Sequence, residues 1–211
     1  MLLLACGAPS DAVILTRALE AGDPAICVDM RDAYGRAECV AAVVPEDPAD
    51  CHELPALWRD ECVFSSAEAL ASTDLPAAID ACHDSRFARE CSFHLIRDQA
   101  RSVAADDAAA ASTVAATLSD IPRAPDARFL FWQEWFVAGR AEGIVASPDR
   151  CEGASDPLDC VDGLRRLGFQ TVRGLGLERA CERMAAGPLA QDLDVGPEIR
   201  GELMDPCPTG D

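Results

Sequence analysis

Residues 23–39, DPAICVDMRDAYGRAEC, and residues 47–62, DPADCHELPALWRDEC, show the same arrangement. Each segment begins with Asp-Pro, has a cysteine three residues after the proline, and ends with an acidic residue followed by a second cysteine. A third copy, SPDRCEGASDPLDC, covers residues 147–160, and a looser copy contains Pro76, Cys82 and Glu90-Cys91. This repetition predicts that the chain is built from several copies of one structural unit.

Each copy is expected to form a short helix, a turn and a longer helix. Asp or Ser before Pro is typical of a helix start, because the side chain caps free amides and Pro fits the first helical position. The second cysteine lies on an apolar stripe at helical spacing, as in Phe87-Cys91-Leu95. Turn-forming residues separate the two cysteines of each copy: Tyr34-Gly35, Pro55, Asp84-Ser85 and Ser155-Asp156-Pro157.

One straight helix cannot contain both cysteines of a disulfide in these copies. Their separations of 9 to 12 residues correspond to about 13–18 Å along a helix, whereas a disulfide needs Cα atoms within about 7 Å. The chain must therefore fold back, which predicts an αα-hairpin. We expect an all-α fold, made of an irregular repeat of disulfide-stapled αα-hairpins, because no convincing strand pattern is present.

The eleven cysteines divide into Cys6 and an even set of ten. The repeat predicts pairing in chain order: Cys27 with Cys39, Cys51 with Cys62, Cys82 with Cys91, Cys151 with Cys160, and Cys181 with Cys207. Such a set favours an oxidising compartment outside the cytoplasm. Because the closest cysteines are nine positions apart, zinc ribbons, c-type haem attachment and thioredoxin-like motifs are excluded.

The segment Leu3-Leu4-Ala5-Cys6 resembles the lipobox of bacterial lipoproteins. That resemblance implies lipidation of Cys6 and a location in the bacterial cell envelope, periplasmic or at the surface, with a lipid anchor in a membrane. A signal peptide needs an apolar run of about 7–15 residues, so either the true start lies upstream of Met1 or the match is accidental. We favour the first and interpret residues 1–9 as a truncated signal and tether, and residues 10–211 as a single helical-repeat domain.

The net charge of −19, from 37 acidic and 18 basic residues, argues against a nucleic-acid partner, because phosphate backbones repel an acidic protein. An acidic residue precedes the second cysteine of each copy. These acids form either a solvent-facing set, which we prefer, or a row that binds cations. They are Glu38, Glu61, Glu90 and Asp159.

No motif predicts a catalytic residue, a cofactor or a metal site. Cys51-His52 and Cys82-His83 are the nearest to a metal-ligand or thiolate–base arrangement. The repeat instead assigns both cysteines to disulfides and both histidines to helix ends. We therefore favour a binding module over an enzyme.

The segment RFLFWQEWF, residues 128–136, is interpreted as part of a copy that has lost its cysteines. Phe129, Trp132 and Phe136 share one helical stripe, which is typical of a core. The alternative is a partner-binding patch that also includes Trp135. The preceding small residues predict one long helix over residues 97–118.

The plan of stapled hairpins is similar to that of helical cysteine-rich, Sel1-like repeat proteins of bacteria. This resemblance is one of architecture, because the lengths of the copies vary along the chain. We expect stacked hairpins that bind a protein or an envelope component. The alternative function is an enzyme or small-molecule carrier with a cavity near residues 128–136.

Overall fold

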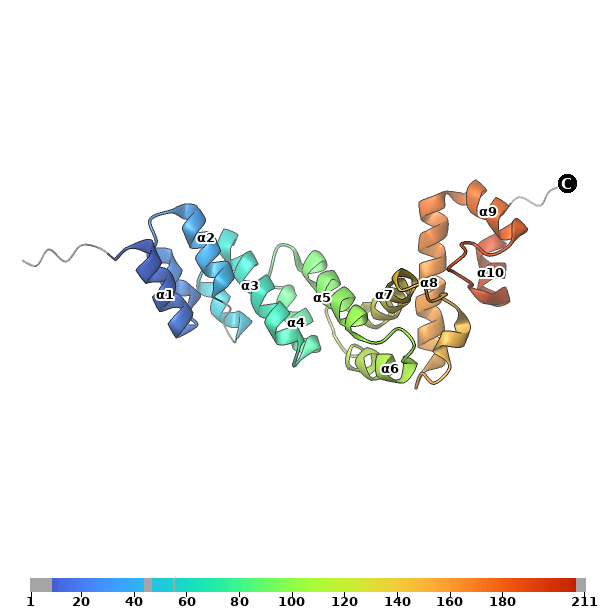
Figure 1. The fold of residues 1–211 in the computed structure, drawn as a ribbon, viewed down its shortest axis with the longest axis horizontal. Coiled ribbons are helices and arrows are strands. Elements are labelled where there is room, and N and C mark those ends of the chain that lie inside the picture. Colours follow the sequence, from blue (N-terminus) through green and yellow to red (C-terminus); the bar gives the residue numbers. More distant parts are fainter. Residues whose placement is uncertain (1–8, 44–46, 55, 208–211) are drawn as a thin grey trace, which may run out of the picture. The chain divides into compact units, whose positions relative to one another are not determined.

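The computed structural model describes residues 9–43, 47–54 and 56–207, and this part of the chain is mostly helical and contains no β-strand (Figure 1). The all-α prediction is thus confirmed. The residues form two compact units, Met1–Leu95 and Ile96–Asp211, with the boundary inside helix α5 (Ala88–Ser102). Each unit is described by itself.

The first unit alternates short 3-10 helices with α-helices. Asp23 and Asp47 each accept a hydrogen bond of 2.9 Å from the backbone amide two residues on, and each is followed by proline, as the sequence predicts. Besides the start of α5, the elements of this unit are α1 (Asp11–Ala21), η1 (Pro24–Asp29), α2 (Ala33–Ala42), η2 (Pro48–Glu53), α3 (Ala56–Ala71) and α4 (Leu75–Cys82).

The core of the first unit consists of aliphatic side chains and cystines. Helix η1 packs against α1 and α2, and α3 packs against η2 and α4. Among the residues that the structure describes here, no aromatic side chain is fully buried. Three disulfides cross this core, and all six of their cysteines are at most 1% exposed: Cys27–Cys39, Cys51–Cys62 and Cys82–Cys91.

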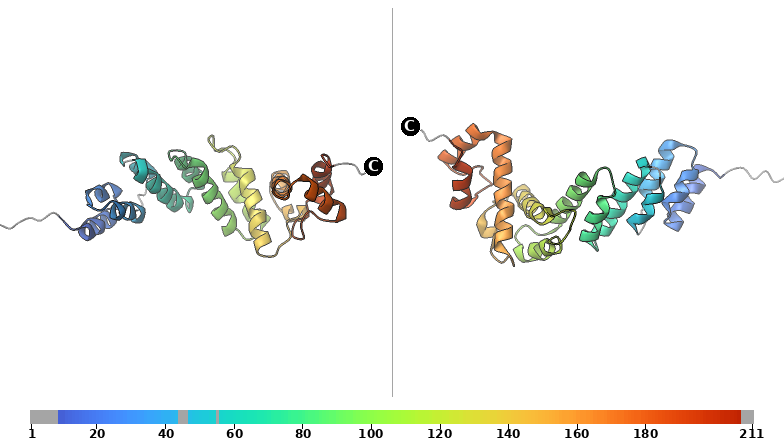
Figure 2. Two further views of the ribbon diagram at one scale, coloured as in Figure 1. Left: turned by 90° about the horizontal axis from the view of Figure 1, so that it is seen from above. Right: turned by 180° about the vertical axis from the view of Figure 1, so that it is seen from behind.

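The second unit is arranged around its longest helix, α8. Helix α7 packs against one side of α8, while α9 and α10 lie on the other side (Figure 1 and Figure 2). The remaining turns of α5 also belong to this unit. Its other elements are α6 (Ala108–Thr117), α7 (Ala127–Ala141), η3 (Pro148–Cys151), α8 (Pro157–Leu175), α9 (Leu177–Ala186) and α10 (Gly196–Met204).

Aromatic side chains from α7 form the centre of the second unit. Trp132 and Trp135 meet edge to face with ring centroids 5.5 Å apart, and Trp135 meets Phe136 at 5.3 Å. Gly163 allows α8 to approach α7, because a Cβ at this position would lie 2.3 Å from the Cβ of Trp132. Two disulfides complete the unit, Cys151–Cys160 and Cys181–Cys207.

Three local expectations differ from the structure. Residues 97–118 form two helices instead of one, because α5 ends at Ser102 and Asp107 caps α6 by accepting a hydrogen bond from the amide of Ala110. The side chain of Ser147 makes no capping hydrogen bond at η3. Phe87 precedes α5 and is 54% exposed, so it is not part of the buried stripe.

The five disulfides join the cysteines in the chain order expected from the sequence. The predicted lipidation site, Cys6, lies outside the described residues. That residues 10–211 form a single domain stays a prediction. Within the described ranges, no helix combines the length and the hydropathy needed to cross a membrane.

Candidate functional site

A cavity of about 280 Å³ lies in the first unit, beside the disulfide Cys82–Cys91. We call it the Phe87 pocket. Helix α3 supplies one wall, and the loop between α4 and α5 together with the first turn of α5 supplies the other. Its lining residues are Asp60, Glu61, Phe64, Ser85, Phe87, Glu90 and Cys91.

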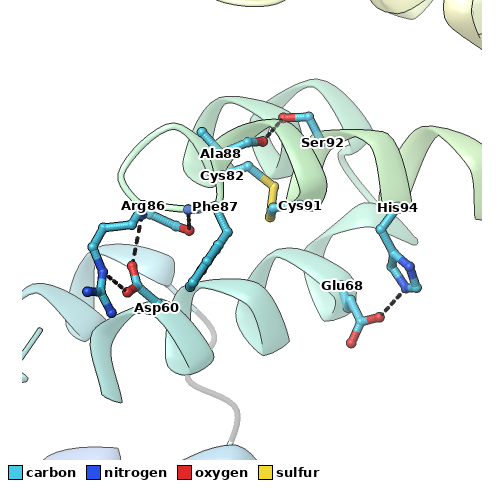
Figure 3. The surroundings of a disulfide bond; sticks show 10 residues. Asp60, Glu68, Cys82, Arg86, Phe87, Ala88, Cys91, Ser92 and His94 are labelled. Atoms are coloured by element: carbon cyan, nitrogen blue, oxygen red, sulfur yellow. Dashed lines mark hydrogen bonds and ion pairs between the residues drawn. A yellow bond between two sulfur atoms is a disulfide. The ribbon is translucent and has the colours of Figure 1, made fainter. Parts of the chain in front are cut away.

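An ion pair fixes the loop to α3. The Asp60 carboxylate accepts hydrogen bonds from the Arg86 backbone amide at 2.9 Å and from Arg86 Nε at 2.6 Å (Figure 3). Burial by itself raises the pKa of the Asp60 carboxyl, but these hydrogen bonds and the positive charge of Arg86 outweigh it and hold the pKa below its usual value. The Asp60 carboxyl is therefore ionised, and its hydrogen bonds with Arg86 hold the loop against α3 beside the pocket.

The same loop holds Phe87 over α3. The Phe87 amide donates a hydrogen bond of 2.8 Å to Ser85 Oγ, and the ring points from the loop toward α3 (Figure 3). The disulfide joins the last residue of α4 to the first turn of α5, so the chain between them is closed at both ends. The loop that carries this 54% exposed aromatic side chain is thus held by a disulfide and an ion pair.

The opposite aromatic wall is also held in place. Phe64 lies on α3 with its ring centroid 5.2 Å from that of His94. His94 Nε2 in turn lies 2.8 Å from Glu68 Oε1 (Figure 3). This arrangement limits the side-chain positions open to Phe64 and keeps an apolar surface beside the cavity.

The rim of the Phe87 pocket is acidic. Glu61 and Glu90 are exposed, and neither carboxylate makes an ion pair or hydrogen bond with any residue of the described chain. Asp60, by contrast, is already neutralised by Arg86. An apolar wall with unpaired carboxylates at its edge fits the aliphatic stem and charged head of a lysine or arginine side chain.

The predicted aromatic patch lies elsewhere and is mostly core. Trp132, Trp135 and Phe136 are at most 1% exposed, so they do not form an open aromatic surface. Phe129 is half-buried, and the guanidinium groups of Arg128 and Arg166 lie over its ring, at 4.8 Å and 4.7 Å from the centroid. Arg128 and Trp132 line a smaller cavity, of about 200 Å³.

The acids that precede the second cysteines occupy different environments. Glu38, Glu61 and Glu90 are exposed, whereas Asp159 is half-buried and lies 3.1 Å from Arg128 Nε. The cysteines beside His52 and His83 are both in disulfides, so neither histidine faces a free thiolate. His52 Nε2 instead lies 3.4 Å from the Asp84 carboxylate.

The spacing Phe87-Cys91-Leu95 predicted one apolar helical stripe, so it gave no indication of the Phe87 pocket. One available signal was the turn Asp84-Ser85, which separates two helices and ends two residues before this phenylalanine. The ion pair of Asp60 with Arg86 joins residues 26 positions apart and has no local signature in the sequence.

A search of protein-family models, of curated proteins and of solved structures finds no match to this chain.

Proposed function

We propose that this protein is a module of the bacterial cell envelope that binds a basic segment of a partner protein in the Phe87 pocket. In this proposal the chain is tethered to a membrane through a lipid on Cys6, and it works outside the cytoplasm. The module acts by binding, with no catalytic step of its own.

The main support for this proposal is the combination of fixed aromatic walls and unpaired carboxylates. Phe64 and Phe87 offer apolar surface, and Glu61 and Glu90 offer negative charge that no described residue neutralises. The net charge of −19 adds long-range attraction for a basic partner and repels acidic ones.

The proposed architecture is an irregular repeat of disulfide-stapled αα-hairpins. In its favour, four disulfides each join a short helix to the helix that follows it, over 9 to 12 residues. The joined helices are η1 and α2, η2 and α3, α4 and α5, and η3 and α8. Rigid stacks of this kind present fixed surfaces for protein partners.

The proposed compartment is supported by the cysteine chemistry. All ten cysteines among the described residues are in disulfide pairs, and such pairs persist in oxidising compartments.

Metabolic labelling with an alkyne fatty acid tests the proposed lipid anchor. The gene is expressed in a bacterial host together with its upstream genomic sequence. We expect labelling that Cys6→Ser removes; equal labelling of both proteins would contradict the anchor.

Peptide binding tests the pocket. A fluorescein-labelled peptide of alternating arginine and glycine should bind, and the same peptide with glutamine for arginine should not, as measured by anisotropy at low salt. The double variant Glu61→Gln, Glu90→Gln should bind the arginine peptide about tenfold more weakly than the unmodified protein. Phe87→Ala should weaken binding with little change in melting temperature, because the ring is half exposed.

A matched charge control separates the pocket from the acidic surface as a whole. Glu20→Gln with Glu38→Gln removes two exposed carboxylates from the same unit and gives the same net charge of −17, since −19 + 2 = −17. We expect this variant to bind the peptide within about twofold of the unmodified protein. Equal weakening by both double variants would show that the peptide binds the acidic surface without a specific pocket.

A further inference from the structure

Three potential metal ligands converge on one side of α5. They are Glu68, His94 and Asp98, and one ligand atom from each lies within 4.8 Å of the other two. Among the residues that the structure describes, this is the one group of three His, Cys, Asp or Glu side chains that meets this distance. We call it the His94 cluster, and none of its members lines the Phe87 pocket.

The helices place these ligands side by side. His94 and Asp98 lie one turn apart on α5, which is a continuous helix from Ala88 to Ser102, so both side chains project from the same face. Glu68 comes from α3, and its Oε1 lies 2.8 Å from His94 Nε2 (Figure 3). An ion bound here would join α3 to α5 through their side chains.

The spacing of the ligand atoms suits a single ion. Nitrogen and oxygen ligands lie about 2.0–2.2 Å from a zinc ion, so two of them on the same ion are about 3–4.2 Å apart. The observed spacings, 2.8 Å for one pair and at most 4.8 Å for all three, lie close to this range. Small side-chain rotations therefore bring the three atoms around one ion.

The ligand types select the class of ion. The His94 imidazole is held in place by the ring of Phe64, with the two centroids 5.2 Å apart. One imidazole nitrogen with two carboxylate oxygens favours a divalent transition metal over calcium or magnesium, which prefer oxygen ligands alone. The side chains of Glu68, His94 and Asp98 are 45%, 30% and 51% exposed, so an ion can reach them and water can complete its coordination.

The charge of the His94 cluster also favours a cation. Its two carboxylates, from Glu68 and Asp98, carry more negative charge than one histidine can balance. Arg97 Nε donates to Asp98 Oδ1 at 3.3 Å, but this contact joins adjacent residues at an exposed position. Such ion pairs contribute little to stability, so a metal ion can replace this one.

We propose that the His94 cluster binds one divalent transition-metal ion, with zinc as the representative. His94 would bind it through Nε2 and carry its ring hydrogen on Nδ1, and Glu68 and Asp98 would each supply one carboxylate oxygen. Three protein ligands leave a position for water, which distinguishes this site from closed structural zinc sites with four protein ligands. The proposal does not depend on the function of the Phe87 pocket.

Isothermal titration calorimetry with zinc chloride at pH 7.5 tests this proposal. The buffer contains excess magnesium chloride, which occupies sites made of carboxylates alone. We expect one zinc ion to bind per chain and to raise the melting temperature of the protein. Absence of zinc binding in the presence of magnesium would overturn the proposal.

Variants locate the ion. His94→Gln should weaken zinc binding at least tenfold and abolish the rise in melting temperature, and Glu68→Gln and Asp98→Asn should each weaken binding several-fold. His52→Gln is the matched control, because His52 is also exposed and lies 3.4 Å from a carboxylate, that of Asp84, but belongs to no such group of three in the described chain.

The control variant should bind zinc within about twofold of the unmodified protein. All four positions are at least 30% exposed, so we expect each variant to fold, and far-ultraviolet circular dichroism checks this. Unchanged zinc binding by His94→Gln, or equal weakening by His52→Gln and His94→Gln, would contradict the proposed site.

Discussion

The two units of this protein reach a folded core by different means. The first unit places six cysteines in its core and has no fully buried aromatic side chain among its described residues. The second unit buries Phe131, Trp132, Trp135 and Phe136 on one helix. Short helices bury little apolar surface, so the first unit depends on covalent links, whereas the second has enough aromatic surface to rely on packing.

The units also treat buried charge differently. In the first unit the Asp60 carboxylate is matched by Arg86. In the second, the Arg150 guanidinium lies over the rings of Trp135 and Phe136, at 4.1 Å and 4.9 Å from their centroids. Burial lowers the pKa of Arg150 to about 10, although the charges of Asp106 and Glu142 act to raise it. The Arg150 guanidinium is thus held by aromatic packing and by a hydrogen bond that its Nη2 donates to the carbonyl oxygen of Ala105.

Reduction of the disulfides should give the largest difference between the units. Each bridge over 9 to 12 residues restricts the unfolded chain by about 2.5–3 kcal/mol in the entropic model, or roughly 8 kcal/mol for the three bridges of the first unit. We expect hydrogen exchange after reduction to show loss of protection in residues 11–82 before the loss in α7 and α8. Simultaneous loss in both regions would show that the second unit depends equally on its bridges.

Removal of an aromatic side chain should have the converse effect. Trp135→Ala leaves a cavity in the second unit and removes the ring that Arg150 covers, so the free energy of unfolding should fall by about 3–5 kcal/mol. Urea denaturation followed by circular dichroism measures this loss. Trp58→Ala, at a half-buried position in the first unit, should cost distinctly less. An equal cost at both positions would contradict the distinction between the two cores.

The close approach of α7 and α8 can be tested with two glycines of the same helix. Gly163→Ala should destabilise the protein by about 1–3 kcal/mol, because its new Cβ would overlap Trp132 and the α7 backbone. Gly174→Ala is the control: its Cβ meets nothing within 4 Å, and alanine favours helix. Thermal melts should show opposite signs for the two changes. A neutral Gly163→Ala would mean that α8 can move away from α7 at no cost.

Two buried carboxyls should respond to pH in opposite directions. The pKa of Asp60 is lowered in the folded protein. Its contribution to the free energy of unfolding is therefore present above the unfolded pKa of about 3.9 and is lost as pH falls through the folded pKa. Burial raises the pKa of Glu134, although Gln133, Arg101 and Arg97 act to lower it. Its contribution is therefore fully present below the unfolded pKa and is lost as pH rises through the folded pKa.

Denaturation at several pH values measures these two effects. At pH 7, Asp60→Asn should cost about 1–2 kcal/mol, and this cost should shrink below pH 4. Glu134→Gln should be neutral or slightly stabilising at pH 7, with a smaller effect in acid. A pH-independent cost of Asp60→Asn would show that the carboxylate charge is not what stabilises the loop.

Local patterns in the sequence predicted most of the helical architecture. The capping residues Asp23 and Asp47 and the cysteine spacing identified where helices start and which cysteines pair. The prediction of one helix over residues 97–118 was wrong. It rested on the alanine content, whereas Asp107 caps a new helix inside this segment. Phe87 keeps the predicted i, i+4 spacing to Cys91, whose amide donates to the Phe87 carbonyl oxygen, but it lies just before α5 and its side chain is 54% exposed.

The candidate sites could be predicted only in part. The sequence placed a cavity near residues 128–136 as an alternative, and Arg128 and Trp132 do line one. Its other walls come from α6 and the start of α8, and their meeting depends on how the helices cross. The Phe87 pocket depends on the pairing of Asp60 with Arg86, which no local pattern encodes.

By itself, the sequence determined most of the helices, the cysteine pairs and the acidic character of the protein, because these follow from short-range geometry and from composition. The tertiary structure alone decided which side chains meet across helices. It buried most of the predicted aromatic patch and left Phe87 exposed beside two unpaired carboxylates. The physical reason is that packing joins residues far apart in the chain, where neither propensity nor spacing specifies contact.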